Sequence, residues 1–251
     1  PLAKQYLLLE GRTRTLKHST PRTQIGFGGI DSVMCYLLPS FFEEYLAKHT
    51  QISLSLYTYN SWDVFQRLES GEIDVGITHI NSARGRLEKK HFSNQSIDIM
   101  PLFTEPYVLL MPKSCTEHDL AQHTISPQAL DLAHEVYAEF DMGLRTWHQQ
   151  MWPEQQPRMY AMGSISLIIP QLLSRPQSWS IVPLSVAKIL CARSPFIWKP
   201  LGGDLLPRRA CCLGINWNGS EDKNTAIRLF TQALRSFVEQ DTLHRIEAKE
   251  S

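Results

Sequence analysis

Residues 24–45 (QIGFGGIDSVMCYLLPSFFEEY) constrain the fold more than any other stretch, because they join a strand pattern directly to a helix pattern. Residues 25–27 form a short apolar strand, and Gly28 and Gly29 predict a turn after it. The apolar positions that follow are spaced by three and four, as on one buried face of a helix. Such a junction presents unpaired backbone N–H groups, so it predicts a site for a small ligand, above all an anion. A plain packing corner is the alternative.

The alternation of strands and helices continues through two series. In the first, residues 51–59 and 73–77 have strand patterns, and the helix between them follows Asn60 and Ser61 and ends at Gly71. The remaining predicted strands are 105–112, 136–140, 158–162, 179–183 and 210–217, and the remaining predicted helices are 144–151, 165–173, 184–190 and one from 222. This order predicts an α/β fold with parallel strands, whose ligands bind beyond the carboxyl ends of the strands.

Charge and composition argue against several classes of protein. Lys plus Arg and Asp plus Glu both number 25, so the net charge is near zero and the chain itself is a poor partner for nucleic acid. No apolar run is long enough to span a membrane. Five cysteines, an odd and scattered set, favour a reducing compartment, the cytoplasm, over a disulfide framework.

Motifs of enzymes, metal sites and cofactor sites do not occur in the sequence. It contains no GxGxxG, GxxxxGKS/T, GxSxG, HExxH or CxxC pattern. We therefore expect no catalytic residues, no cofactor and no metal. An enzyme remains an alternative, because carboxylates and histidines are scattered along the chain.

Residues 1–20 form a segment apart. Their apolar positions follow a heptad pattern over about two repeats, and basic residues gather toward the end of the segment, where they suit a helix C-terminus. We expect either an ordinary surface helix or the end of a dimerising linker helix. Because the chain begins at Pro1 without a methionine, we expect a fragment of a longer protein or a processed product.

Several motifs, in this order, resemble the effector-binding domain of LysR-type transcriptional regulators. The most specific are LESGEIDVGI (68–77) and PLFTEPYVLLMP (101–112). The stretch 24–45 with its internal Pro39, the segment SWSIVP and the strand RRACCLGI also match. The resemblance extends from residue 24 to about residue 238, which is almost the whole chain.

This resemblance implies a periplasmic-binding-protein-like fold, in which a ligand cleft separates two α/β subdomains. Subdomain I would comprise residues 24–112 plus 207–245, and subdomain II residues 113–206. The resemblance also implies a winged helix-turn-helix domain that binds promoter DNA. That domain would be joined through a long dimerising helix, of which residues 1–20 would be the end. A homodimer or tetramer is the implied assembly.

The interval from Ile25 to Pro39 departs from the family by being slightly longer than usual. If the helix begins late, Pro39 lies in its first turn, where the missing N–H costs nothing. If the helix begins at Ser32, Pro39 kinks it. In the second case a loop over residues 28–31 would carry the extra length and alter the wall of the cleft.

Candidate ligand-binding residues follow from the strand ends and helix starts that match the family. Ser32 and Ser61 take the hydroxyl positions, with a helix cap as the alternative role for each. His79 takes the place of a basic side chain, with a solvated loop histidine as the alternative. Residues 140–142 would form the opposite wall, although Phe140 alone is equally typical of a core. The full predicted set is Gly28, Gly29, Asp31, Ser32, Asn60, Ser61, His79, Phe140, Asp141, Met142, Met162 and Ser164.

Helix-start donors, hydroxyls and His79 favour a small carboxylate as the ligand. Asp31 and Asp141 instead suit a cationic or hydroxylated compound. Some members of the family sense peroxide through cysteines, but Cys35 falls beside the apolar helix face and is expected to be a buried, inert thiol. Cys211 and Cys212 are adjacent in a strand, so their side chains point to opposite faces.

Together these patterns predict the effector-sensing and oligomerisation domain of a bacterial LysR-type regulator, with no enzymatic activity. A small polar molecule in the cleft would favour one arrangement of the subdomains and so change the spacing of the DNA-binding domains. The alternative is a solute-binding protein of a transporter, which shares the fold.

Overall fold

The computed structural model describes residues 22–80, 96–115, 123–157, 159–161, 165–173, 175–193, 195–203 and 205–247. The strands are β1 (Thr23–Gly29), β2 (Ile52–Thr58), β3 (Val75–His79), β4 (Ile97–Pro112), β5 (Val136–Ala138), β6 (Met159–Ala161), β7 (Ser180–Pro183), β8 (Phe196–Pro200) and β9 (Arg208–Asn216). The helices are η1 (Val33–Leu37), α2 (Pro39–Lys48), α3 (Ser61–Ser70), η2 (Pro127–Ala129), η3 (Leu132–His134), α5 (Met142–Met151), α6 (Ile165–Leu172), α7 (Leu184–Arg193) and α8 (Glu221–Glu247). The heptad segment 1–20 lies outside the described residues.

The main sheet has the strand order β2-β1-β3-β9-β4-β7, and β8 also pairs with β4. Strand β1 pairs in parallel with both β2 and β3, whereas β9 is antiparallel to β3 and β4. Strands β5 and β6 form a separate parallel pair. The predicted α/β class and the parallel arrangement of the first three strands are thus confirmed.

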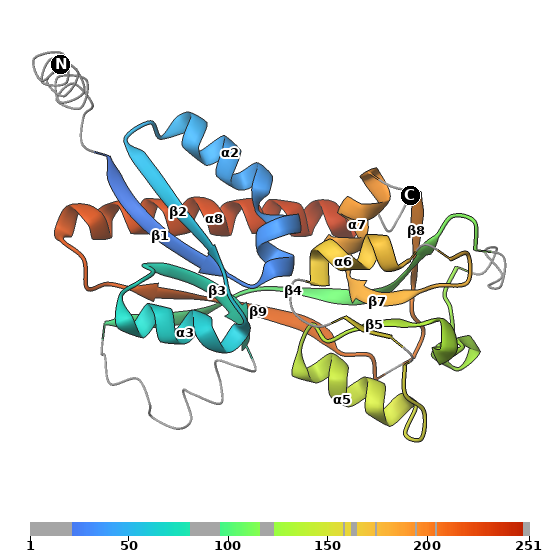
Figure 1. The fold of residues 1–251 in the computed structure, drawn as a ribbon. Helices are drawn as coiled ribbons and strands as arrows, with labels where there is room; N and C mark the ends of the chain where they lie inside the picture. The colour runs from blue at the N-terminus through green and yellow to red at the C-terminus, as the bar shows by residue number, and fades with distance from the viewer. Residues whose placement is uncertain are drawn as a thin grey trace, which may run out of the picture.

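Strand β4 passes through two separate hydrophobic cores. Its first part pairs with β9, and from Tyr107 onward it pairs with β7 and β8. Phe103 belongs to the first core, with the side chains of β1, α2 and α8, whereas Tyr107 to Met111 belong to the second core. Figure 1 shows β4 and β9 running across the molecule, from β1–β3 with α2 and α3 toward β7, β8 and α5–α7. The two strands therefore connect the two halves of the structure.

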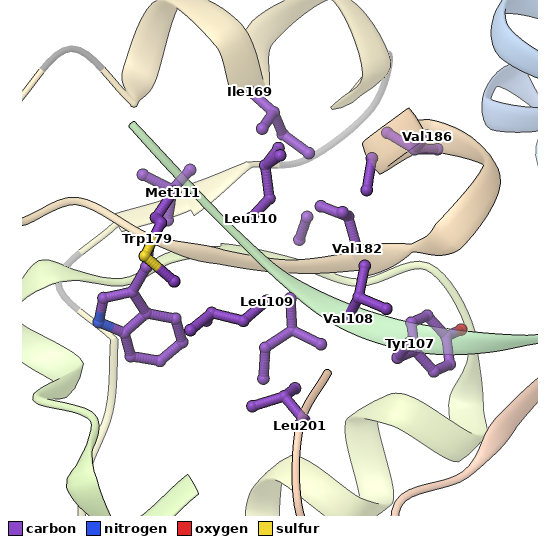
Figure 2. Close-up of a cluster of buried hydrophobic side chains, with 14 of the residues drawn as sticks. Tyr107, Val108, Leu109, Leu110, Met111, Ile169, Trp179, Val182, Val186 and Leu201 are labelled. Carbon is purple, nitrogen blue, oxygen red and sulfur yellow. The ribbon is translucent and has the colours of Figure 1, made fainter. Parts of the chain in front are cut away.

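The second core includes Trp179, which is 1% exposed and is the largest of the fully buried side chains. Its indole N–H donates to the backbone oxygen of Asp131 at 3.1 Å, and its ring lies 6.3 Å from that of Trp152. Figure 2 shows Trp179 beside Met111 of β4, with Val182 of β7 and Val186 of α7 at the opposite side of the drawn cluster. Burial of these large apolar side chains is the main stabilising contribution in this half.

Aromatic rings dominate the first core. The ring of Phe230 from α8 lies 5.5 Å from Phe27 of β1, 5.4 Å from Phe41 and 5.0 Å from Tyr45 of α2, in edge-on contacts. These contacts fix α2 and α8 against one face of the sheet. On the other face α3 packs closely, because a Cβ atom at Gly76 would lie 2.6 Å from Val64 Cγ1.

The junction after β1 differs from the predicted glycine turn. Gly28 and Gly29 are buried strand residues of β1, and among the described glycines only Gly71 and Gly203 have positive φ angles. A Cβ atom at Gly28 would lie 2.7 Å from Ile73 Cδ1, so glycine allows the close approach of Ile73 there. The predicted loop over residues 28–31 is therefore wrong.

Pro39 resolves the alternatives for the first helix. The chain forms the π-helical turn η1, in which the N–H of Leu38 donates to the oxygen of Val33, and Pro39 then begins α2. Proline fits the first position of a helix because its missing N–H has no partner there. The wider π turn accommodates one more residue than an α turn, so helical structure takes up the extra length.

Three further expectations need correction. Cys35 is exposed, not buried. Trp62 of α3 and Leu229 of α8, at positions where the spacing of apolar residues predicts a buried helix face, are 56% and 53% exposed. Strand β4 begins at Ile97, well before the predicted start at residue 105, and β8 was not predicted at all.

The prediction that the side chains of Cys211 and Cys212 point to opposite faces of the sheet is confirmed, because they belong to different apolar clusters. In the described chain, no helix combines the length and apolarity needed to cross a membrane.

Candidate ligand-binding site

A buried ion pair lies where β4 and β9 pass between the two cores. Glu105 and Arg209 are directly opposite in the β4–β9 ladder, with Arg209 Nε 3.4 Å from Glu105 Oε1. Arg209 is 0% exposed and Glu105 is 1% exposed. Charges buried this deeply are rare unless paired, because the loss of hydration costs several kcal/mol per ion. Because both charges are buried, the region where β4 and β9 carry Glu105 and Arg209 is the candidate functional site.

Each member of the pair extends to a different half of the molecule. Arg209 Nη1 donates to the hydroxyl of Ser32 at 2.9 Å, at the start of η1. Glu105 accepts from the backbone N–H of Ser185 at 2.7 Å and from the Ser185 hydroxyl at 3.1 Å, at the start of α7. Ser32 makes no side-chain cap for η1, so the capping interpretation of its hydroxyl is wrong.

His79 and Ser61 form a second pair of polar side chains beside Arg209. The Ser61 hydroxyl lies 2.9 Å from His79 Nδ1, and His79 is 6% exposed. The helix cap of α3 is instead Asn60, whose side-chain oxygen accepts from the N–H groups of Trp62 and Asp63. His79 is thus a buried residue at the end of β3, and the interpretation as a solvated loop histidine is wrong.

The imidazole of His79 stays neutral over the physiological range. Burial, together with the positive charge of Arg209, lowers the pKa of His79 from 6.5 to about 3. A neutral ring that bonds through Nδ1 presents its other nitrogen, Nε2, to whatever lies next to it. His79 therefore contributes hydrogen-bonding capacity to the site and no charge.

The half of the molecule with the second core contributes Asp141 and Tyr107 to the same polar site. Asp141 caps α5 by accepting from the N–H of Leu144 at 2.7 Å. Burial and the neighbouring Asp141 carboxylate raise the pKa of Tyr107, so its hydroxyl stays protonated. Tyr107 Oη faces Asp141 without a hydrogen bond of normal geometry. Phe140 is buried against Tyr107, with ring centres 6.4 Å apart, as a core residue would be.

Buried polar atoms without hydrogen-bond partners concentrate in this cluster. Of six such side-chain atoms in the described part of the chain, four lie here: Arg209 Nε, Arg209 Nη2, His79 Nε2 and Tyr107 Oη. Folded proteins satisfy nearly all buried polar groups, so a concentration of this kind needs an explanation such as a ligand. We name Ser32, Ser61, His79, Glu105, Tyr107, Asp141 and Arg209 the crossing cluster.

The crossing cluster contains four of the predicted site residues: Ser32, Ser61, His79 and Asp141. Other predicted residues have different structural roles: Gly28 and Gly29 allow close packing, Asn60 caps α3, Asp31 is half-buried at the start of η1, and Met142 is 57% exposed. Met162 and Ser164 lie outside the described residues. No group of three or more His, Cys, Asp or Glu side chains suited to a metal ion occurs within the described ranges.

Sequence reasoning missed Glu105, Tyr107 and Arg209, because it sought ligand contacts at strand ends and helix starts. A usable signal existed for Glu105, which is a charged residue inside the largely apolar motif PLFTEPYVLLMP, whereas Arg209 follows Arg208 at the start of its strand. A charge in a buried strand is costly unless it is paired or functional.

The depressed pKa of His79 gives a pH-dependent stability. Between pH 6.5 and 3 the unfolded chain binds a proton on His79 that the folded chain does not, so the free energy of unfolding falls as pH falls. From pH 7 to pH 5 we expect this residue to contribute a loss of about 2 kcal/mol. Urea titrations at both pH values, on wild type and His79→Gln, measure this loss. The exposed His123→Gln is the control; equal pH dependence in all three proteins would contradict the assignment.

Comparison with known families is consistent with this architecture. The model of the LysR substrate binding domain matches residues 18–239. No curated protein sequence matches the chain significantly. Among solved structures, the reduced OxyR regulatory domain from Pseudomonas aeruginosa is similar at 18% identity and a TM-score of 0.62, over 84% of this chain and 96% of that one.

Two longer proteins have the same fold over most of their length. An OxyR mutant from Corynebacterium glutamicum is similar at 15% identity and a TM-score of 0.63, over 99% of this chain and 75% of that one. A full-length BenM mutant is similar at 15% identity and a TM-score of 0.61, over 96% and 76%. The periplasmic-binding-protein-like fold of two subdomains is that of these regulatory domains. The chain belongs to the family of LysR substrate-binding domains, the effector-sensing part of LysR-type transcriptional regulators.

Proposed function

We propose that the chain binds a small polar effector at the crossing cluster, and a small carboxylate is the favoured class. Binding is relayed to a DNA-binding domain through a homodimer or tetramer. The observation that carries the proposal is the concentration of buried polar atoms without hydrogen bonds on Arg209, His79 and Tyr107: Arg209 Nη2, His79 Nε2 and Tyr107 Oη, together with Arg209 Nε, which has only the ion pair with Glu105. A ligand that supplied their partners would gain several hydrogen bonds in a dry environment. The family match makes a regulator better supported than the solute-binding protein of a transporter.

The proposed subdomains follow the two cores. Subdomain I, residues 24–112 plus 207–245, would hold the first core, and subdomain II, residues 113–206, would hold most of the second, to which residues 107–111 of β4 also belong. The Glu105–Arg209 pair sits on the two connecting strands, with Ser32 on one side and Ser185 on the other. A ligand that contacts both sides favours one arrangement of the subdomains over others. That shift is the proposed signal to the rest of the regulator.

We expect the double variant Ser32→Ala with Ser61→Ala to bind effector about thirtyfold more weakly while remaining folded, because each hydroxyl hydrogen bond is worth about 1 kcal/mol. Thermal-shift screening of a metabolite collection identifies a ligand, and calorimetry gives its affinity for each variant. Ser70→Ala, an exposed serine of the same helix as Ser61, is the control. Unchanged affinity in the double variant would place the ligand elsewhere, and a screen without any binder would refute effector sensing by this chain.

A further inference from the structure

We infer, on the basis of the proposed function, that Tyr36 is a latch between the two halves of the molecule and that its release controls how fast the effector reaches the crossing cluster. Tyr36 lies in the π turn η1, and the sequence patterns gave it no role. Two observations carry the inference. Side chains of η1 contact both hydrophobic cores, and polar contacts join the starts of η1 and α7 through the Glu105–Arg209 pair.

The residues of η1 divide between the two cores. Three of them, Val33, Met34 and Leu37, are buried in the first core. Tyr36 instead packs against the second core, and helix α7 of that half lies against η1. Partial burial, with a smaller contribution from Cys35, raises the pKa of Tyr36 to about 12, so its hydroxyl stays protonated. Tyr36 therefore holds a turn of the first half against the second half.

A chain of polar contacts joins the same two elements. At the start of η1, the Ser32 hydroxyl accepts from Arg209 Nη1 at 2.9 Å, and Arg209 Nε lies 3.4 Å from Glu105 Oε1. Glu105 in turn accepts from the N–H and the hydroxyl of Ser185 at the start of α7, at 2.7 and 3.1 Å. The two halves are thus joined beside the connecting strands by this chain and by Tyr36.

An effector has to reach atoms that are buried beside the latch. Because His79 Nε2, Tyr107 Oη and Arg209 Nη2 are buried, a small molecule meets them only after neighbouring segments move apart. Arg209 is bonded to η1 through Ser32, and η1 separates from the second half only when Tyr36 leaves its contact. The association rate then follows the fraction of molecules in which Tyr36 is released. Weakening the Tyr36 contact should raise this fraction.

Cys211 is a native reporter of this opening. It is fully buried and lies two residues from Arg209, on the same face of β9. Burial raises the pKa of Cys211 to about 11, and the nearby charge of Arg209 opposes this rise. Two buried thiols are references: Cys115 in the second core and Cys212 on the opposite face of β9. Faster labelling of Cys211 alone reports local opening at the crossing cluster, whereas faster labelling of all three thiols reports global unfolding.

The test measures alkylation of the three buried thiols by iodoacetamide in the purified chain, and peptide mass spectrometry assigns each rate. Every protein carries Cys35→Ser and Cys191→Ser, which remove the exposed and the half-buried thiol. We expect Tyr36→Ala to accelerate the labelling of Cys211 about tenfold, which corresponds to about 1.4 kcal/mol of lost contact, and to leave both reference thiols unchanged. Tyr36→Phe keeps the ring, so its effect should be smaller. Tyr57→Ala, at a tyrosine of β2 that is 39% exposed, is the matched control and should change none of the three rates.

The consequence for binding is measured by stopped-flow fluorescence with the strongest binder from the metabolite screen. Its association with Tyr36→Ala should be about tenfold faster than with the unaltered tyrosine. If Cys211 is not accelerated, or all three thiols accelerate equally, the latch is refuted while effector sensing stands. If Cys211 alone accelerates and the association rate does not change, the control of access is refuted. A screen without any binder refutes effector sensing and with it the control of access, whereas the labelling of Cys211 still decides whether Tyr36 is a latch.

Discussion

Replacing Glu105 with alanine is expected to lower the free energy of unfolding by about 3–5 kcal/mol, as measured by urea denaturation at neutral pH. The change leaves Arg209, which is 0% exposed, without its counter-ion 3.4 Å away. It also removes the acceptor of the Ser185 N–H and hydroxyl at the start of α7. An unbalanced buried cation and two lost hydrogen bonds act in the same direction.

The surface offers a matched control for Glu105. Glu139 lies 3.6 Å from Arg145, and about half of the arginine side chain is exposed. Exposed pairs contribute between 0 and about 1 kcal/mol, so Glu139→Ala should be nearly neutral. Glu105→Gln keeps the shape and one of the two oxygens that accept from Ser185, so its cost should fall between the two. Equal small costs for Glu105→Ala and Glu139→Ala would show that Arg209 is balanced by other groups.

Local patterns were sufficient for much of the fold. The alternation of residues 51–59 and the capped helix that ends at Gly71 predicted β2 and α3 closely, because both depend on neighbours in sequence. Strand β8 was not predictable in this way. It is the five-residue segment FIWKP, it lacks regular alternation, and its strand character comes from pairing with β4. The early part of β4 carries Pro101 and a register shift, which hid it from a periodicity argument.

The error at Cys35 has a specific physical cause. The apolar positions of residues 34–45 were assigned to one continuous α-helix, which placed Cys35 beside the buried face. The structure instead has the π turn η1 before α2, and a π turn advances each residue by a smaller angle than an α turn. Side chains in the first turn are therefore rotated relative to the predicted face, and Cys35 is exposed. No spacing rule based on a regular helix could show this.

The candidate site was predictable to the extent that it lies at element junctions. Ser32, Ser61 and His79 are at helix starts or a strand end, where the sequence alone directs attention. Arg209 and Glu105 lie within strands, and the contact from Arg209 to Ser32 joins residues 177 positions apart. Such long-range contacts depend on the whole fold, so the residue that organises the cluster became visible only in the structure.

Replacing Trp179 with alanine is expected to lower the free energy of unfolding by about 3–5 kcal/mol, because it removes a large, fully buried side chain from the second core and leaves a cavity. The side chain is 1% exposed, and its loss also leaves the Asp131 carbonyl without the indole donor. Trp179→Phe keeps most of the apolar contact and loses only the donor and some volume, so its cost should be smaller. Denaturant titrations of both variants measure these differences.

The matched control is Trp62→Ala, because Trp62 is 56% exposed on α3 and its removal should cost less than about 1 kcal/mol. Comparable losses for Trp62 and Trp179 would contradict the assignment of the second core. The Trp179 variants also separate stability from recognition. Trp179 belongs to the core and not to the crossing cluster, so Trp179→Phe should retain effector affinity at a temperature where it remains folded, whereas Arg209→Lys should lose affinity.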